Sequence, residues 1–260
     1  MNFEDIIYEK KGPIATITIN RPKRYNSFTE QTVEEMTAAF QDVEEDGAIG
    51  VAVLTGEGKN FSTGGDVNME NEYTAAIGRR ICKKTLMLST VMRNNAKPII
   101  ARVKGYAIGG GNELHILCDM TLASEEARFG QAGPKIGNVP IWYATQMLQG
   151  IVGEKKAREM CLLCFQYSAK EACDMGLINK VVAEDQLDAE VEKWCQRALT
   201  MSPNALRVAK VSLNYASDLL YGGVAHGIEM LYGLHGSDEF KEGTQAFLDK
   251  RKPDFNQFRK

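Results

Sequence analysis

The stretch KGYAIGGGNEL, Lys104 to Leu114, places three successive glycines between an apolar, β-rich run and the start of an expected helix. A second stretch, KNFSTGGDV from Lys59 to Val67, follows another β-rich apolar run in the same way. Glycines at such a junction let the backbone approach a ligand closely and leave N–H groups unpaired. Two such loops can direct two N–H groups at one carbonyl oxygen, which is the arrangement that stabilises an oxyanion.

Each loop taken alone also fits a purely structural explanation. Gly109, Gly110 and Gly111 can simply allow a helix to pack tightly on a sheet. A phosphate-binding loop is disfavoured, because the chain has neither G-x-x-x-x-G-K-[ST] nor the G-x-G-x-x-G spacing of a dinucleotide fold.

Strand and helix signals alternate through the first 185 residues. Repeated strand-to-helix connections of this kind predict an α/β fold with substantially parallel strand pairing and functional groups on loops beyond the strand ends. The expected strands are Ile14–Asn20, Val51–Gly56, Ile99–Val103, Asp119–Ser124 and Leu177–Val182, and the expected helices are Thr29–Glu45, Tyr73–Asn94 and Gly110–Cys118.

The pattern of the sequence changes after Asp185, where helical segments follow one another without a convincing strand between them. We therefore divide the chain into a core, residues 1–185, and a helical C-terminal region, residues 186–260. This region is expected to cover the site or to pack on neighbouring subunits, because a tail in water should not expose so many apolar side chains. Its apolar positions include Leu219, Leu220, Ile228, Leu231 and Leu234.

Composition excludes several classes of protein. The 260 residues are 44% hydrophobic and 25% charged, as in a globular domain, and the net charge of -3 gives no basic excess for nucleic acid. No apolar run approaches the roughly 18 residues of a membrane span, and the first residues are acidic where a signal peptide would be basic. We expect a cytoplasmic protein. The Cys161-x-x-Cys164 pair lacks partners for a metal site and is interpreted as core packing.

Taken together, the motifs resemble those of the crotonase (enoyl-CoA hydratase/isomerase) superfamily over nearly the whole chain. NRPKRYNSF resembles its early CoA-binding segment, FSTGGDV its first oxyanion loop and GYAIGGGNELHILCDMTLASEEARFGQ its longest motif. SAKEACDMGLINKVV and EGTQAFLDKRKPDF match its late segments. The resemblance implies a spiral of ββα units, a helical trimerisation region, and a homotrimer or homohexamer. It implies an acyl-CoA thioester as substrate, with coenzyme A as part of that substrate and no separate cofactor or metal.

The resemblance also implies residue roles. The backbone N–H groups of Gly65 and Gly110 would hold the thioester oxygen, and Glu113 would act on a proton or a water molecule. The segment around Arg24 and Tyr25, with Asp66 of the first loop, would bind the CoA part. The alternative for Glu113 is a helix-start carboxylate, which the helix dipole favours by a few tenths to about 1 kcal/mol.

This sequence departs from the hydratase pattern at one important place. Hydratases carry a proline and a second glutamate after the position of Gln131, whereas this chain has Ala132 and Gly133. GQAGPKIG instead resembles the dihydroxynaphthoyl-CoA synthases and ketocyclohexanecarboxyl-CoA hydrolases. That branch often has an aspartate where Pro140 stands, and a tyrosine where His235 stands. His235 is either a proton shuttle near neutral pH or a polar residue at a helix end.

The leading interpretation is addition of water to an unsaturated or cyclic dienoyl-CoA, through a thioester enolate held by Gly65 and Gly110. Hydrolytic cleavage of a cyclic β-keto acyl-CoA uses the same oxyanion site, and a single glutamate also permits double-bond isomerisation. The alternative from another class of function is that the chain is a catalytically silent CoA-binding protein. The retained Glu113 and the two glycine loops favour an enzyme.

Overall fold

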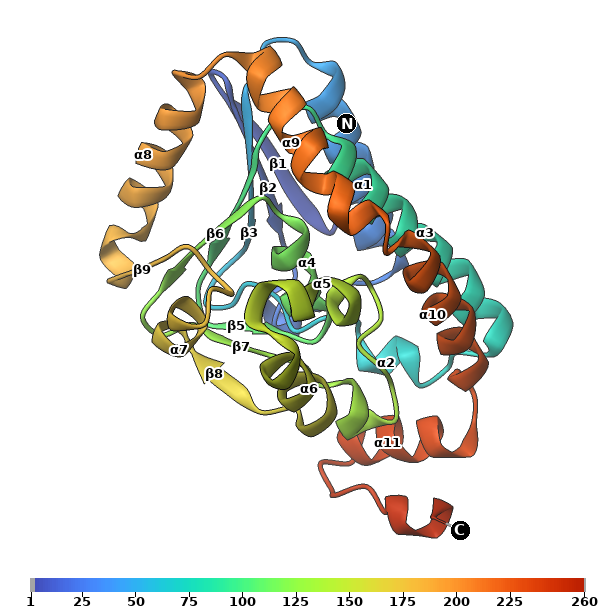
Figure 1. Cartoon of the computed structure of the whole chain (residues 1–260). Helices are drawn as coiled ribbons and strands as arrows, with labels where there is room; N and C mark the ends of the chain where they lie inside the picture. The colour runs from blue at the N-terminus through green and yellow to red at the C-terminus, as the bar shows by residue number, and fades with distance from the viewer. Residues whose placement is uncertain (1–2, 260) are drawn as a thin grey trace.

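A six-stranded sheet in the order β1-β2-β3-β4-β6-β9 organises the computed structural model, which describes residues 3–259 except for the Ala144 side chain (Figure 1). The pairing of β1 with β2 is antiparallel, and every other pairing in this sheet is parallel. The predicted α/β class with mainly parallel pairing is therefore confirmed. The strands are β1 (Ile6–Lys11), β2 (Ile14–Ile19), β3 (Val51–Gly56), β4 (Ile99–Val103), β6 (Met120–Ser124) and β9 (Lys180–Val182).

A second, three-stranded sheet stands beside the first. Its strands are β5 (Tyr106–Ile108), β7 (Arg128–Gly130) and β8 (Gln166–Ser168), with β5 parallel to β7 and β7 antiparallel to β8. Along the chain β4 leads into β5 and then helix α4, so two strands and a helix form one repeating turn of the fold. The structure thus has the ββα units that the resemblance implied.

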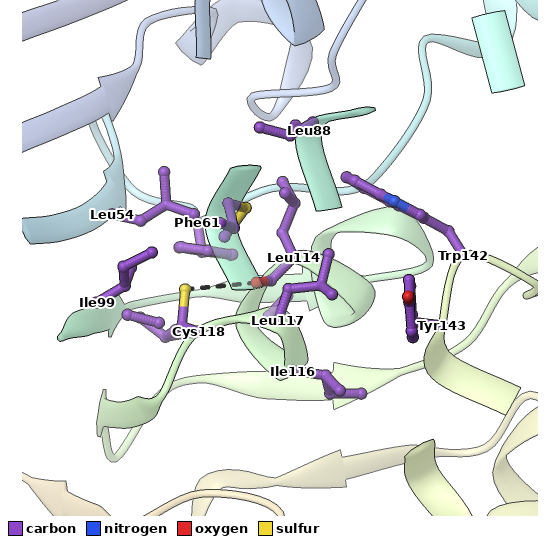
Figure 2. Packing of buried hydrophobic residues seen from close by; sticks show 14 of the residues in the cluster. Leu54, Phe61, Leu88, Ile99, Leu114, Ile116, Leu117, Cys118, Trp142 and Tyr143 are labelled. Atoms are coloured by element: carbon purple, nitrogen blue, oxygen red, sulfur yellow. Dashed lines mark hydrogen bonds between the residues drawn. The ribbon is translucent and has the colours of Figure 1, made fainter. Parts of the chain in front are cut away.

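Helix α4 (Gly110–Leu117) is almost entirely buried. In Figure 2 Leu54 and Ile99 lie on one side of α4, and Trp142 and Tyr143 lie on the other. The Cys118 thiol donates a hydrogen bond of 3.4 Å to the Leu114 carbonyl oxygen at the end of this helix. Because core side chains surround α4, its first turn is held in a fixed position relative to both sheets.

The other helices pack around the two sheets. α8 lies against β3, β4 and β6, α10 packs on α3, and α11 contacts α2 (Figure 1). Thr29 caps α1 through a capping box, as expected from a threonine just before a periodic run. The α-helices are α1 (Glu30–Glu45), α2 (Val67–Glu70), α3 (Ala75–Asn94), α5 (Ala144–Val152), α6 (Glu154–Leu163), α7 (Ala169–Asp174), α8 (Leu187–Leu199), α9 (Pro203–Asp218), α10 (Tyr221–Leu234) and α11 (Asp238–Leu248). Short 3-10 helices are η1 (Pro22–Arg24), η2 (Gly133–Ile136), η3 (Glu184–Gln186) and η4 (Phe255–Phe258).

Two local expectations are corrected. The expected strand from Leu177 begins only at Lys180, because Leu177 turns back to donate its N–H to the Ala172 carbonyl. Ile228 is only 6% exposed and packs on the core of its own chain, as Leu231 does in part. Ile228 is therefore not free for contact with another subunit, and Leu231 is free only in part. Cys161 and Cys164 are both buried, as the core-packing interpretation predicts.

Within the part of the chain that the structure describes, no helix combines the length and apolar character needed to cross a bilayer.

Candidate active site

The two glycine loops meet directly. A parallel bridge joins Ser62 to Ala107, and the Ile108 N–H donates to the Ser62 carbonyl at 3.0 Å. The backbones then approach so closely that a methyl group placed on Gly64 would lie 2.6 Å from the Gly110 nitrogen. Gly109 has φ +59°, a conformation that glycine adopts without strain, and it turns the chain into α4.

Neither the Gly65 N–H nor the Gly110 N–H has a hydrogen-bond acceptor within residues 3–259. Gly110 is the first residue of α4, where backbone donors have no partner in the helix and the helix dipole is positive. The neighbouring donors are occupied, since the Gly109 N–H bonds to the Gly130 carbonyl at 2.9 Å and the Asp66 N–H to the Phe28 carbonyl at 3.1 Å. The two contacting loops therefore offer two free donors, one from each loop, which is the number that an oxyanion site requires.

Both loops line a cavity of about 970 Å³. Its walls bring together Gly65, Gly110, Glu113 and His235 with Arg24, Tyr25 and Asp66, so every site residue expected from the sequence borders the same space. Cations also gather here, namely Lys23, Arg24, Lys135, Lys250 and Arg251. Arg251 is paired with Glu242 and Asp249, whereas the other four form no ion pair with any described residue.

Glu113 lies in the first turn of α4 and is 6% exposed. Its Oε1 accepts a hydrogen bond of 2.9 Å from the Trp142 backbone N–H. Burial raises the pKa of Glu113 well above its ordinary range; the bond from Trp142 opposes this rise and the charge of Glu70 adds to it. A buried carboxyl group with a raised pKa that borders a cavity is a candidate for proton transfer.

Two cavity residues were not anticipated from the sequence. Glu70, at the end of the four-residue helix α2, is half-buried and lines the cavity. Burial raises its pKa to about 7; a hydrogen bond with Asn138 opposes the rise and the charge of Asp66 adds to it. Trp142 supplies the N–H that holds Glu113, and its indole N–H donates to the Thr85 carbonyl at 2.8 Å. A helix as short as α2 has no periodicity that sequence analysis can detect.

The ring of His235 borders the cavity but is packed tightly. It meets Tyr73 and Phe240 edge-on, with centroid distances of 5.5 and 5.1 Å, and a methyl group on Gly78 would lie 1.8 Å from its Nδ1. Burial lowers the pKa of His235 to about 4, so the ring is neutral near pH 7. This neutral state disfavours the proton-shuttle alternative and favours a role in shaping the cavity.

The residues expected to bind CoA differ in exposure and in whether their side chains already have partners. Arg24 and Tyr25 are exposed at the cavity mouth, and Tyr25 has φ +53° at the end of η1. Asp66 is buried and already engaged, since it pairs with Arg21 at 3.0 Å and accepts the Asn68 N–H that caps α2. Asp66 therefore holds the loop in place, and contact with CoA stays a prediction for this residue.

Gly133, the position that lacks a glutamate, begins η2 at the cavity wall. A methyl group placed there would lie 2.9 Å from the Asn138 carbonyl oxygen and 3.0 Å from the Val139 Cα. The backbone of Asn138 and Val139 thus fills the place that a side chain at residue 133 would take. The site accordingly has a carboxyl group on each of two elements, α2 and α4, and none on η2.

Within residues 3–259, no group of three or more His, Cys, Asp or Glu side chains is arranged to hold a metal ion. What the cavity offers is a pair of backbone donors, two carboxyl groups with raised pKa values and a cationic mouth. Such a set can polarise a carbonyl group, stabilise the enolate that forms from it and move protons at the neighbouring carbon atoms.

Comparison with known proteins places these features in a family. Residues 9–259 match the family model described as enoyl-CoA hydratase/isomerase. The chain is 28% identical to an enoyl-CoA hydratase from Mycobacterium avium subsp. paratuberculosis, with a TM-score of 0.87 over 98% of this chain and 99% of the other. It is 29% identical to an enoyl-CoA hydratase/isomerase from Xanthobacter autotrophicus, with a TM-score of 0.88 over 96% and 98%.

A probable enoyl-CoA hydratase from Mycobacterium smegmatis is 31% identical, with a TM-score of 0.78 over 95% of this chain and 98% of the other. The family match covers both glycine loops, α4 and the C-terminal helices. The chain therefore belongs to the enoyl-CoA hydratase/isomerase family and has the crotonase fold, with ββα units followed by C-terminal helices.

Proposed function

We propose that this protein adds water to an α,β-unsaturated or cyclic dienoyl-CoA. The observation that carries the proposal is the pair of unpaired N–H groups, at Gly65 and Gly110, in one cavity with the buried Glu113. The two donors would hold the thioester oxygen while negative charge develops on it. Glu113 would activate or orient the water molecule that attacks the β-carbon.

A panel of linear and cyclic acyl-CoA esters, incubated with the protein and analysed by mass spectrometry, tests this proposal. The expected result is a gain of one water by an unsaturated ester with its CoA retained and its ring, where there is one, intact. An unchanged panel, or release of free CoA from every ester, would contradict it.

Hydrolytic opening of a cyclic β-keto acyl-CoA is the second candidate. Two observations support it. GQAGPKIG resembles the ketocyclohexanecarboxyl-CoA hydrolases and their relatives, and Gly133 has no carboxyl group. In that reaction water attacks the ring ketone, and the bond that breaks leaves a thioester enolate in the same oxyanion site. The same panel separates the candidates by which ester gains water, an unsaturated ester in hydration or a cyclic β-keto ester in ring opening. Because both products gain the mass of one water, fragment spectra are then used to detect the new carboxyl group that only ring opening produces.

CoA binding at the cationic mouth is a testable part of the proposal. Lys23 and Arg24 have no described ion-pair partner, and CoA carries several phosphate charges. Replacing both with alanine should weaken acyl-CoA binding by up to about 30-fold, because each exposed contact is worth at most about 1 kcal/mol. Calorimetry with an acyl-CoA and its free acid provides the measurement. Lys83→Ala, an exposed cation on α3, is the control. Equal affinities for ester and free acid in the unaltered protein would refute this binding mode.

We further propose that the protein assembles as a homotrimer or homohexamer through the helical region of residues 186–260. Apolar side chains on α9, α10 and the turn between them are exposed, more than a monomer in water usually presents. They are Val208, Val211, Leu213, Tyr215, Leu219 and Met230. Sedimentation should show three or six copies, and a stable monomer at micromolar concentration would overturn the assembly. A cytoplasmic location stays a prediction from the sequence.

A further inference from the structure

Helix α2 forms without any contribution from the side chain of Glu70, its last residue. Its N–H bonds to the Asp66 carbonyl in α2 at 2.9 Å, which completes the short helix without using the side chain. The side chain folds back over the first glycine loop, so that a methyl group placed on Gly65 would lie 2.0 Å from Glu70 Oε1. The carboxyl group therefore lies against the loop that presents one of the two free N–H donors.

The surroundings of Glu70 leave its charge uncompensated. Among the described residues it forms no ion pair, whereas its neighbour Asp66 is paired with Arg21. Asn138 opposes the rise in the pKa of Glu70, and this residue belongs to the segment that a side chain at Gly133 would meet. An unpaired carboxylate in a cavity is costly for folding, which makes a purely structural role a poor explanation.

Glu113 faces the same space from α4. The charge of Glu70 raises the pKa of Glu113, so the two carboxyl groups interact across the cavity. When two carboxyl groups influence each other in this way and both are partly desolvated, the pair holds a proton to a higher pH than either would alone. One member can then accept a proton while the other donates one.

We propose that Glu70 is the second proton-transfer residue of this site, exchanging a proton with the α-carbon of the bound acyl-CoA, in the role that Gly133 cannot fill. This inference rests on the proposed function. The positions of the two carboxyl groups indicate which proton transfer each of them carries out. Glu70 lies against Gly65, beside the place of the thioester carbonyl and hence of the α-carbon. Glu113 is left to act on water.

The proposed step balances without any additional reactant. Glu113 takes one proton from water as the oxygen bonds to the β-carbon, and the C=C electron pair moves toward the thioester, whose oxygen becomes negative. The enolate then re-forms the carbonyl group as the α-carbon takes a proton from Glu70. The product has gained one water, and the proton has passed from Glu70 to Glu113. One proton exchange through solvent restores the starting state.

The test uses a saturated acyl-CoA in D2O, which isolates proton transfer at the α-carbon from the addition of water. Mass spectrometry should show deuterium entering the α-position with the unaltered protein. Glu70→Gln should lose this exchange and lower hydration turnover by about 100- to 10,000-fold, the usual effect of losing a general acid. Its affinity for the acyl-CoA should stay nearly unchanged.

Two variants make the result specific. Glu72→Gln removes an exposed carboxyl group two residues away and should keep both exchange and turnover. Glu113→Gln should lose turnover but keep α-hydrogen exchange. If Glu70→Gln matches Glu72→Gln in both readouts, or if the unaltered protein shows no exchange, the proposal is overturned. Failure of the proposed function would look different, as an unaltered protein that exchanges α-hydrogen but hydrates no ester.

Discussion

Replacing Glu113 with glutamine is expected to lower turnover by about 100- to 10,000-fold while the protein stays folded. The amide oxygen can still accept the hydrogen bond that the Trp142 N–H donates at 2.9 Å, so the shape of the site is kept. Only the group that gains and loses a proton is removed. Steady-state kinetics on a responsive ester provides the measurement, and Glu125→Gln, an exposed carboxyl group between β6 and β7, is the control.

Glu113→Gln should lower turnover but raise the stability of the protein at higher pH. Burial raises the pKa of Glu113 above its ordinary value near 4.5, so the native state binds this proton more tightly than the unfolded state does. The stability gained from this difference is fully present below the unfolded pKa and is lost as the pH rises through the folded pKa. Glu113→Gln lacks that loss, so its melting temperature should gain on that of the wild type as the pH rises from the unfolded pKa near 4.5 through the raised pKa of the folded state. If turnover is unchanged in Glu113→Gln on every substrate, Glu113 is only a helix-start carboxylate.

Replacing Gly110 with alanine should cost about 100- to 1,000-fold in turnover, the effect of losing one oxyanion donor. The added methyl group would lie 2.6 Å from the Phe28 ring and 3.2 Å from the Gly64 Cα. The ring can rotate, but the glycine loop must move away, and the two N–H groups then no longer point at one oxygen. Turnover of the folded variant, verified by circular dichroism, provides the measurement.

Gly47→Ala is the matched control for this change. Gly47 has no neighbour within 4 Å of an added methyl group and does not have positive φ. Its alanine variant should keep full turnover, since the substitution touches nothing near the cavity. Full turnover in Gly110→Ala as well would mean that close contact between the two loops is not needed.

The sequence predicted those features that depend on local pattern. Long amphipathic helices such as α1 and α3 have clear periodicity and caps, at Thr29 and Thr74, and their bounds agree with the structure within two residues at each end. The glycine loops were recognised because residues that permit unusual backbone geometry stand where strand meets helix. The role of Glu113 was predicted from the resemblance of the second loop to the crotonase motif.

Features that depend on tertiary contacts were missed. β5, β7 and β8 have three residues each, too few for an alternating pattern to appear. Glu70 belongs to the site only because its side chain folds over Gly65 and meets Asn138 from a distant segment. The low pKa of His235 likewise comes from burial, which no local pattern around the residue indicates.

The claim that two backbone N–H groups hold the thioester oxygen is tested most directly by nuclear magnetic resonance. An unreactive acyl-CoA carrying carbon-13 at the thioester carbonyl is bound to the protein, and the chemical shift of that carbon is compared with its shift in water. We expect a downfield shift on binding that Glu113→Gln retains and Gly110→Ala diminishes, because hydrogen bonds polarise the carbonyl group. A bound carbonyl whose shift equals that in water, in the unaltered protein, would mean that these N–H groups do not hold the thioester oxygen.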